Sequence, residues 1–273
     1  MSVTPRTPSE IPFSDRLLRA SARFWYVVAV AGIWIFAWYI AALYGLGFLR
    51  GDLDRWNAVL PEGHGYVPGD LRGNVALGVH LLAALVVASG GLLQLVPWIR
   101  ARAPWLHRWN GRLFVLVAMA AAVTGIFIAF TRGAVAGTYM TAGNVLNALL
   151  ILVFGVIAWR EARARRYAAH RRWALRLFVV TLSVWFYRVM MMLWFGVHRA
   201  PVGHNAGFTG PFDIVLAFGH VLLPLAILEL YLLAVERGGQ GARVAMAGLL
   251  TVSTVAMAGG IVLATFGMWL PRL

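Results

Sequence analysis

The chain has 273 residues, of which 61% are hydrophobic and only 12% are charged, and its mean hydropathy is +0.76. A soluble core needs far less apolar surface, so the composition indicates an integral membrane protein. The formal net charge of +14 does not indicate a nucleic-acid partner, because the 24 basic residues fall in short clusters between long apolar runs. With no cysteine, disulfides, thiolate ligands and iron–sulfur clusters are excluded, and redox or metal chemistry would depend on histidine, methionine, carboxylates or a bound organic cofactor.

The apolar runs predict about seven membrane-spanning helices, because a hydrocarbon core of roughly 30 Å needs about 20 apolar helical residues. Residues 1–23 are predicted to be a cytoplasmic N-terminal segment, and the run after them lacks a small-residue cleavage site, which favours a retained first span. We therefore expect an all-α fold, a polytopic transmembrane helix bundle, in a single domain over residues 24–273. Its spans are predicted near 24–48, 73–98, 113–131, 139–159, 174–195, 212–235 and 244–268.

Arginine clusters set the expected topology. They occupy the N-terminal segment and the connections 99–112, 160–173 and 236–243, and the positive-inside rule places such segments in the cytoplasm. The N-terminus is then inside and the C-terminus outside. We expect a multi-pass protein of the bacterial cytoplasmic (inner) membrane, with the lipid bilayer as its first partner.

Four histidines at membrane depth are the first candidates for function, because ionisable groups there are costly and usually face the bundle interior. His80 and His220 each lie seven or eight residues below the outer start of a span, which is roughly 10–12 Å at 1.5 Å per residue. His107 and His170 lie at the inner ends of two other spans. The alternatives are haem-iron ligands in two layers or, more simply, bundle histidines with ordinary hydrogen-bond partners and helix-end anchors.

Arg188 lies at nearly the depth of His80 and His220, in the fifth predicted span. A guanidinium at that level requires an anionic partner. A haem propionate, a quinone or small acid, or Asp213 at the start of the next span are the candidates. Glu229, in the inner half of the sixth span, is expected either to relay protons or to pair with a cytoplasmic arginine.

Two motifs, HRWNGR at 107–112 and HRRWALR at 170–176, resemble a bacterial family of predicted membrane proteins of unknown function over roughly residues 70–195. The same stretch is similar to the di-haem transmembrane cytochrome b family of ascorbate and ferric reductases. That resemblance rests on a histidine, a glycine eleven residues later, a glutamine fourteen later, a basic loop and a following Trp-Asn-Gly-Arg element; here these are His80, Gly91, Gln94, Arg100, Trp109, Asn110, Gly111 and Arg112.

The chain departs from the cytochrome b pattern at one point, because His107 precedes Trp109 and Asn110 instead of following them. The resemblance implies two b haems at opposite membrane faces that pass electrons across the bilayer. The displaced histidine leaves two haems, the outer haem alone, or none as the alternatives.

The leading interpretation is a haem-b membrane oxidoreductase or electron carrier, in which His80 and His220 ligate an outer haem and His107 and His170 an inner one. Arg188 would bind a propionate or an anionic electron donor near the outer face, and Arg108, Arg112, Arg172 and Arg176 would do so inside. A quinone or a redox subunit of a membrane complex would be the partner. The alternatives are a non-catalytic subunit or assembly factor that binds lipid headgroups, a quinone or partner helices, and a small-anion transporter that uses Arg188.

Overall fold

The computed structural model describes residues 12–58, 60 and 62–273, and in this part of the chain it contains helices and no strand. The long helices are α1 (Phe13–Ile40), α3 (Leu71–Gly90), α5 (Pro104–Thr131), α6 (Gly137–Arg163), α7 (Tyr167–Thr181), α8 (Ser183–His198), α9 (Pro211–Arg237) and α10 (Gln240–Ala264). The short ones are η2 (Ala41–Gly45), α2 (Leu46–Leu49), η3 (Leu53–Ala58), η4 (Gly91–Leu95), α4 (Pro97–Arg102), η5 (Thr265–Trp269) and η6 (Leu270–Arg272).

The predicted all-α polytopic bundle is confirmed. Six helical segments are long and apolar enough to cross a membrane, and the bent pair α7 and α8 supplies a seventh if it forms one span. The six segments are Phe13–Leu49, Leu71–Leu95, Pro104–Thr131, Gly137–Arg163, Pro211–Arg237 and Gln240–Arg272.

The predicted fifth span is not a straight helix, because α7 and α8 meet at Leu182 with a bend of 53°. The hydroxyl of Thr181 donates to the carbonyl of Phe178 (2.7 Å), and the N–H of Leu182 reaches back only three residues, to Val179. The backbone ladder is therefore interrupted at Leu182, and no proline lies between Tyr167 and His198. Threonine hydroxyls make similar back-bonds inside the unbroken α5 and α10, at Thr124 and Thr251, so the Thr181 hydroxyl alone does not explain the bend.

Several helices are longer than their predicted spans at the end that carries the arginines. α1 begins at Phe13 instead of residue 24, and α5 begins at Pro104 instead of residue 113. Pro104 occupies the first helical turn, where a missing N–H costs no hydrogen bond. The predicted N-terminal segment 1–23 is therefore helical from Phe13 onward, and its residues 1–11 lie outside the described part of the chain.

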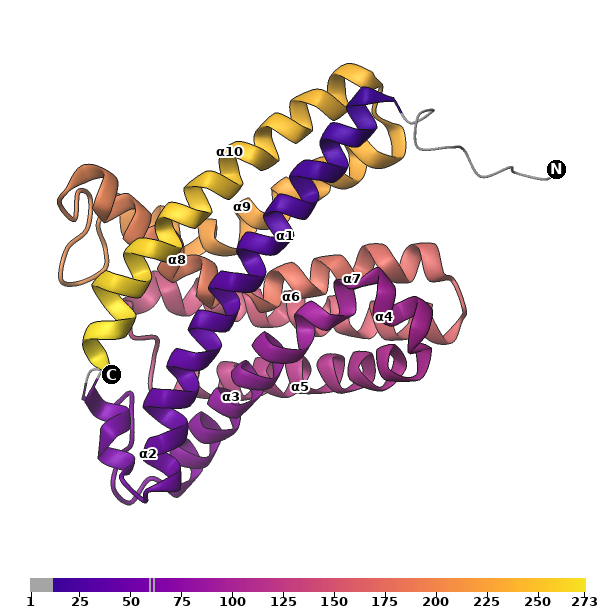
Figure 1. Cartoon of the computed structure of the whole chain (residues 1–273). Coiled ribbons are helices and arrows are strands. Elements are labelled where there is room, and N and C mark those ends of the chain that lie inside the picture. The colour runs from indigo at the N-terminus through magenta and orange to yellow at the C-terminus, as the bar shows by residue number, and fades with distance from the viewer. Residues whose placement is uncertain (1–11, 59, 61) are drawn as a thin grey trace.

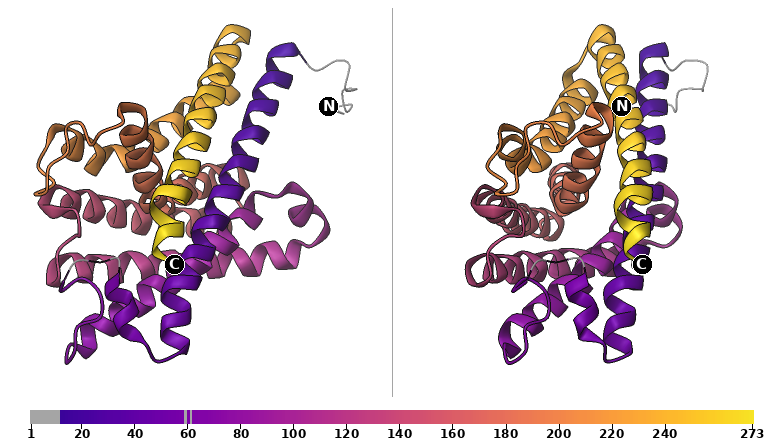
Figure 2. Two further views of the ribbon diagram at one scale, coloured as in Figure 1. Left: turned by 60° about the vertical axis from the view of Figure 1, so that its left-hand side comes forward. Right: turned by 90° about the vertical axis from the view of Figure 1, so that its left-hand side faces the viewer.

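The helices form two groups. α1 packs along α10, whereas α3, α5, α6 and α7 pack in sequence, each against the next. Figures 1 and 2 show α1 and α10 side by side, crossing α5 and α6 at a steep angle. α9 packs on α6, α7, α8 and α10, and so joins the two groups.

Glycines permit the close helix crossings. A Cβ atom on Gly143 of α6 would overlap the carbonyl oxygen of Ala217 in α9, and one on Gly260 of α10 would lie 2.5 Å from the carbonyl oxygen of Val189 in α8. Small residues at such points let helix backbones approach in a membrane, where packing replaces the hydrophobic drive between helices.

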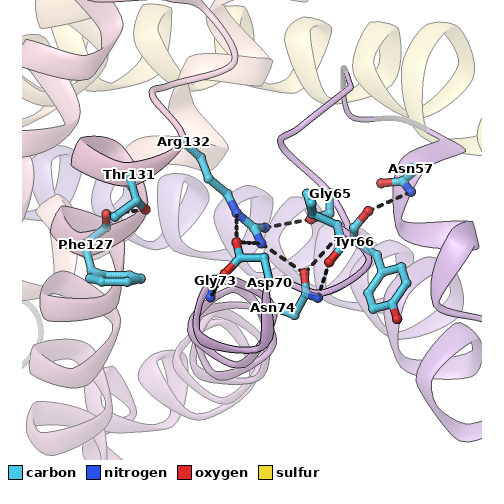
Figure 3. Close-up of polar contacts among 10 residues, drawn as sticks. Asn57, Gly65, Tyr66, Asp70, Gly73, Asn74, Phe127, Thr131 and Arg132 are labelled. Carbon is cyan, nitrogen blue, oxygen red and sulfur yellow. Dashed lines mark hydrogen bonds and ion pairs between the residues drawn. The ribbon is translucent and has the colours of Figure 1, made fainter.

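A polar network fastens the long connection between η3 and α3 (Figure 3). Arg132, at the end of α5, donates to Asp70 Oδ2 (2.6 Å), to Asn74 Oδ1 (2.9 Å) and to the carbonyl of Gly65 (2.7 Å). Asp70 also caps α3 by accepting from the N–H of Gly73 (2.9 Å). One guanidinium thus joins the connection, the start of α3 and the end of α5.

Candidate functional site

A cleft of about 1810 Å³ lies between the two groups of helices. One wall comes from α1, α9 and α10, and the other from α5, α6 and α7, with residues of η4 and α4 at the end and of α8 farther along. Pockets for small molecules measure about 300–1,000 Å³. The cleft therefore has room for a large cofactor or for a ligand the size of a lipid.

The cleft is cationic at one end and apolar beyond it. Seven arginines line it, contributed by α1, α4, α5, α6 and α7: Arg19, Arg23, Arg100, Arg108, Arg112, Arg163 and Arg171. No aspartate or glutamate is among the described residues that line it. All 24 basic residues of the chain are arginine, so these charges are all guanidinium groups. A ligand that is anionic at one end and apolar at the other matches this lining.

Two arginines of α7 are paired with carboxylates of α9. Arg176 donates to both carboxylate oxygens of Glu229 at 2.6 Å, which holds α7 against α9. Arg172 pairs with Glu236 at 3.3 Å along the same interface. Of the two roles expected for Glu229, the structure shows the ion pair with an arginine. The Arg176 guanidinium is therefore already bound to a protein carboxylate, and ligand binding by Arg172 and Arg176 stays a prediction.

The two inner histidines line the same cleft from different helices, His107 from the first turn of α5 and His170 from the first turn of α7. Nδ1 of His170 lies 2.9 Å from the carbonyl oxygen of Ala158 in α6. A carbonyl can only accept, so Nδ1 carries the proton and Nε2 keeps a free lone pair. Histidines that bind metal commonly donate their second ring nitrogen in this manner.

His107 has the opposite hydrogen-bond arrangement. The side-chain amide of Gln94 finds partners for both its nitrogen and its oxygen in one orientation. In that orientation the nitrogen donates to Nδ1 of His107 (2.9 Å) and the oxygen accepts from the N–H of Gly111 (3.1 Å). Nδ1 is then the acceptor, and the proton lies on Nε2. Binding of iron through Nε2 of His107 requires the Gln94 amide to turn over, so that its oxygen accepts from Nδ1–H.

The two outer histidines lie in different helix interfaces. Nδ1 of His80 lies 3.0 Å from the carbonyl oxygen of Ala121 in α5, and the ring packs against Gly125. His220 is fully buried; its Nδ1 lies 2.9 Å from the carbonyl oxygen of Leu216 in its own helix, and its Nε2 has no partner among the described residues. Both rings therefore keep Nε2 free, but α3 packs on α1 and α5 whereas α9 packs on α6, α7, α8 and α10.

Arg188 has no carboxylate partner within residues 12–58, 60 and 62–273. Its guanidinium donates to the carbonyl of Val184 (3.1 Å) and lies 5.4 Å from the centre of the Phe36 ring. Asp213, the protein partner considered for it, instead accepts from Nδ1 of His204 (2.7 Å) and caps its own helix. The structure thus gives Arg188 an aromatic neighbour and leaves its anionic partner unassigned.

Comparison with protein families gives a match to the model described as "Predicted membrane protein (DUF2306)" over residues 77–231, which is more than half of the chain. The chain belongs to this family. The matched region contains His80, His107, His170 and His220, together with Arg112, Arg176 and Arg188. No curated protein and no solved structure matches the chain.

Within the cleft, the sequence analysis missed the convergence of charge. Arg19, Arg23, Arg163 and Arg171 enter the sequence-based prediction only as topology signals, and Arg100 only as the basic loop of the cytochrome b resemblance; the α1 pair lies outside the family match. A signal was present in the spacing, because Arg19 and Arg23, like Arg108 and Arg112, are four residues apart and so share one helix face. Which faces meet depends on how the two helix groups cross.

Proposed function

We propose that the protein is a haem-b membrane oxidoreductase or electron carrier, with its inner haem site in the cleft between His107 and His170. The observation that carries the proposal is that these two histidines, from separate helices, line one apolar cleft with arginines at its end. A bound haem would supply one-electron chemistry, and two axial imidazoles are a common way to hold it.

The donor set fits a haem in part. His170 presents Nε2 while Nδ1 faces the carbonyl of Ala158, and unpaired guanidiniums such as those of Arg108 and Arg112 suit the two propionates. His107 fits only after the Gln94 amide turns over. The role of the chain's own residues would be to fix the imidazole orientation at His170 and to bind the anionic edge of the ring.

The proposal includes an outer haem between His80 and His220, and the hydrogen bonds of the two rings support it. Each of the two rings has Nδ1 at a backbone carbonyl, and Nε2 of His220 is buried without a partner. Because α3 and α9 pack on different neighbours, such a haem would have to join two separate helix interfaces. Arg188 would then bind its propionate.

For the topology, we propose an N-terminus inside and a C-terminus outside in the bacterial inner membrane. Support comes from the arginines, which gather at the end of the bundle where α1 begins and α6 and α7 meet. The cleft end with His107 and His170 would then face the cytoplasm. A quinone or a redox subunit would exchange electrons with it.

The test is a visible absorption spectrum of detergent-purified protein, oxidised and dithionite-reduced, after haem-supplemented expression. We expect a sharp haem-b α-band, with haem per chain counted as its pyridine complex. His170→Ala and His107→Ala should each remove the inner haem, and His80→Ala and His220→Ala the outer one, whereas His198→Ala at the exposed end of α8 should leave the spectrum unchanged. A colourless wild-type protein would contradict the proposal and favour a non-catalytic binding or assembly role.

A further inference from the structure

We propose that the cleft also binds an anionic phospholipid of the membrane, with the lipid phosphate among the arginines and the acyl chains along the apolar wall made by α1, α9 and α10. This inference rests on the lining of the cleft and does not require a haem, although the two ligands would share Arg108 and Arg112.

Each wall of the cleft carries two guanidinium groups that lie next to each other on one helix. Arg19 and Arg23 lie one helical turn apart on α1, and Arg108 and Arg112 lie one turn apart on α5. Guanidinium groups bind phosphate oxygens through two parallel hydrogen bonds, which makes them well suited to a phosphodiester. The two pairs line the same cleft from different helices, so an anion bound in the cleft would reduce the repulsion between them.

The distribution of carboxylates supports a bound anion. Arg172, Arg176 and Arg243 lie between helices and pair with Glu236, Glu229 and Asp15. None of the seven arginines that line the cleft has an ion-pair partner in the described part of the chain. Like charges placed together destabilise a fold unless a counter-ion joins them, and here no carboxylate on the cleft lining supplies one.

The apolar part of the cleft distinguishes a phospholipid from a free phosphate. On the α9 and α10 side it is lined by Leu223, Ile227, Leu228, Leu250, Ala256 and Met257. Such a surface is unfavourable in contact with water and favourable in contact with acyl chains. The cleft volume of about 1810 Å³ exceeds what one small ligand needs. A phospholipid uses both the charged end and the apolar wall, whereas inorganic phosphate would use only the arginines.

The experiment counts lipid retained by the purified full chain, in neutral detergent, by native mass spectrometry. The protein is titrated with phosphatidylglycerol, with phosphatidylcholine of the same acyl chains, and with inorganic phosphate as competitor. The test variants are Arg19→Gln/Arg23→Gln and Arg108→Gln/Arg112→Gln. The matched control is Arg102→Gln/Arg237→Gln, which removes two exposed arginines that do not line the cleft.

We expect phosphatidylglycerol to bind at least about tenfold more tightly than phosphatidylcholine, since each basic residue near a lipid anion contributes about fivefold. Each test variant should lose about tenfold or more in affinity for phosphatidylglycerol, and the control less than about twofold. Equal affinity for the two lipids, or an equal loss in the control, would overturn the proposal. Displacement by equimolar phosphate would also overturn it, because the acyl chains would then contribute nothing to the affinity.

A variant in the apolar wall tests the proposal separately, in case the arginine variants do not fold. Ala256→Phe should fill part of the acyl groove on α10 and weaken both lipids, with the arginines intact; unchanged binding would contradict the placement of the chains. Haem spectra recorded on the same samples separate the two proposals. A colourless protein that still selects phosphatidylglycerol refutes the haem site only, and a haem-binding protein that selects no lipid even after its haem is removed refutes this one only.

Discussion

Both nitrogens of the Arg176 guanidinium that face α9 lie 2.6 Å from the carboxylate oxygens of Glu229. The pair is partly shielded, with 18% of the arginine side chain and 40% of the glutamate side chain exposed. The same guanidinium lies 4.6 Å from the centre of the Trp173 ring. It therefore fixes how α7 meets α9, beside the start of α7 that carries His170.

Removal of one partner should destabilise the bundle measurably. We expect Glu229→Gln to cost about 1–2 kcal/mol, after allowance for solvent screening of a half-exposed pair. For a chain of this size that corresponds to a fall of about 2–6 °C in apparent Tm in detergent. The exchanged variant Arg176→Glu/Glu229→Arg should recover part of the loss. Equal Tm for wild type and Glu229→Gln would show that the pair does not hold the helices.

The close approach of α6 and α9 at their crossing depends on Gly143. A methyl group there would overlap the carbonyl oxygen of Ala217, so Gly143→Ala should destabilise by about 1–3 kcal/mol through overpacking. Gly219 on α9 is the matched control, because a Cβ there would meet nothing within 4 Å. Gly219→Ala should be neutral or stabilising, since alanine is the better helix former. Thermal unfolding of both variants in one detergent checks the difference, and similar Tm values would contradict the close crossing.

The pH dependence of stability should include a contribution from Asp70. The guanidinium of Arg132, and then the N–H of Gly73, hold the pKa of Asp70 below its ordinary value of 3.8. The charged carboxylate therefore stabilises the folded state above that ordinary value, and the stabilisation is lost as the pH falls through the lowered pKa. Asp70→Asn should lower Tm at pH 7 and should converge with wild type near the acid limit of the fold. A constant Tm difference at every pH would contradict this assignment.

Gln94 should control the occupancy of the inner haem site. A carboxylate at this position can only accept, so Gln94→Glu should place the proton of His107 on Nδ1 and free Nε2 for iron. We expect haem affinity at the inner site to rise, by about tenfold if the effect matches that of other groups that orient metal ligands. The readout is haem per chain at limiting haem supply. Gln94→Leu serves as the control that removes orientation without supplying an acceptor, and a lower haem content in Gln94→Glu than in Gln94→Leu would refute the assigned role.

The number and position of the membrane helices could be predicted from sequence because each depends on a local property, the length of an apolar run. The break at Leu182 could not, because it is an interruption of the backbone hydrogen bonds, and a hydropathy average does not register such an interruption. The longer α1 and α5 were missed for a related reason. Arginines end the apolar run, which sets the predicted bound, but they do not end the helix.

The histidines of the candidate site could be predicted from the sequence, but the way the helices bring the site together could not. His107 and His170 were expected to share one level of the bundle, and the structure places both on one cleft. The direction of the Gln94 hydrogen bond and the convergence of Arg19 and Arg23 with the arginines of α5 depend on side-chain geometry and on the helix crossing. Neither follows from spacing along the chain.

The exclusive use of arginine in the cleft lining also has a consequence for how a ligand could leave. Guanidinium groups stay protonated at any pH that a cell tolerates, and enzymes that acetylate lysine have no target here. Neither an acid shift nor acetylation can discharge the arginines themselves. Competition by a second anion would then be the direct way to release a ligand from these arginines.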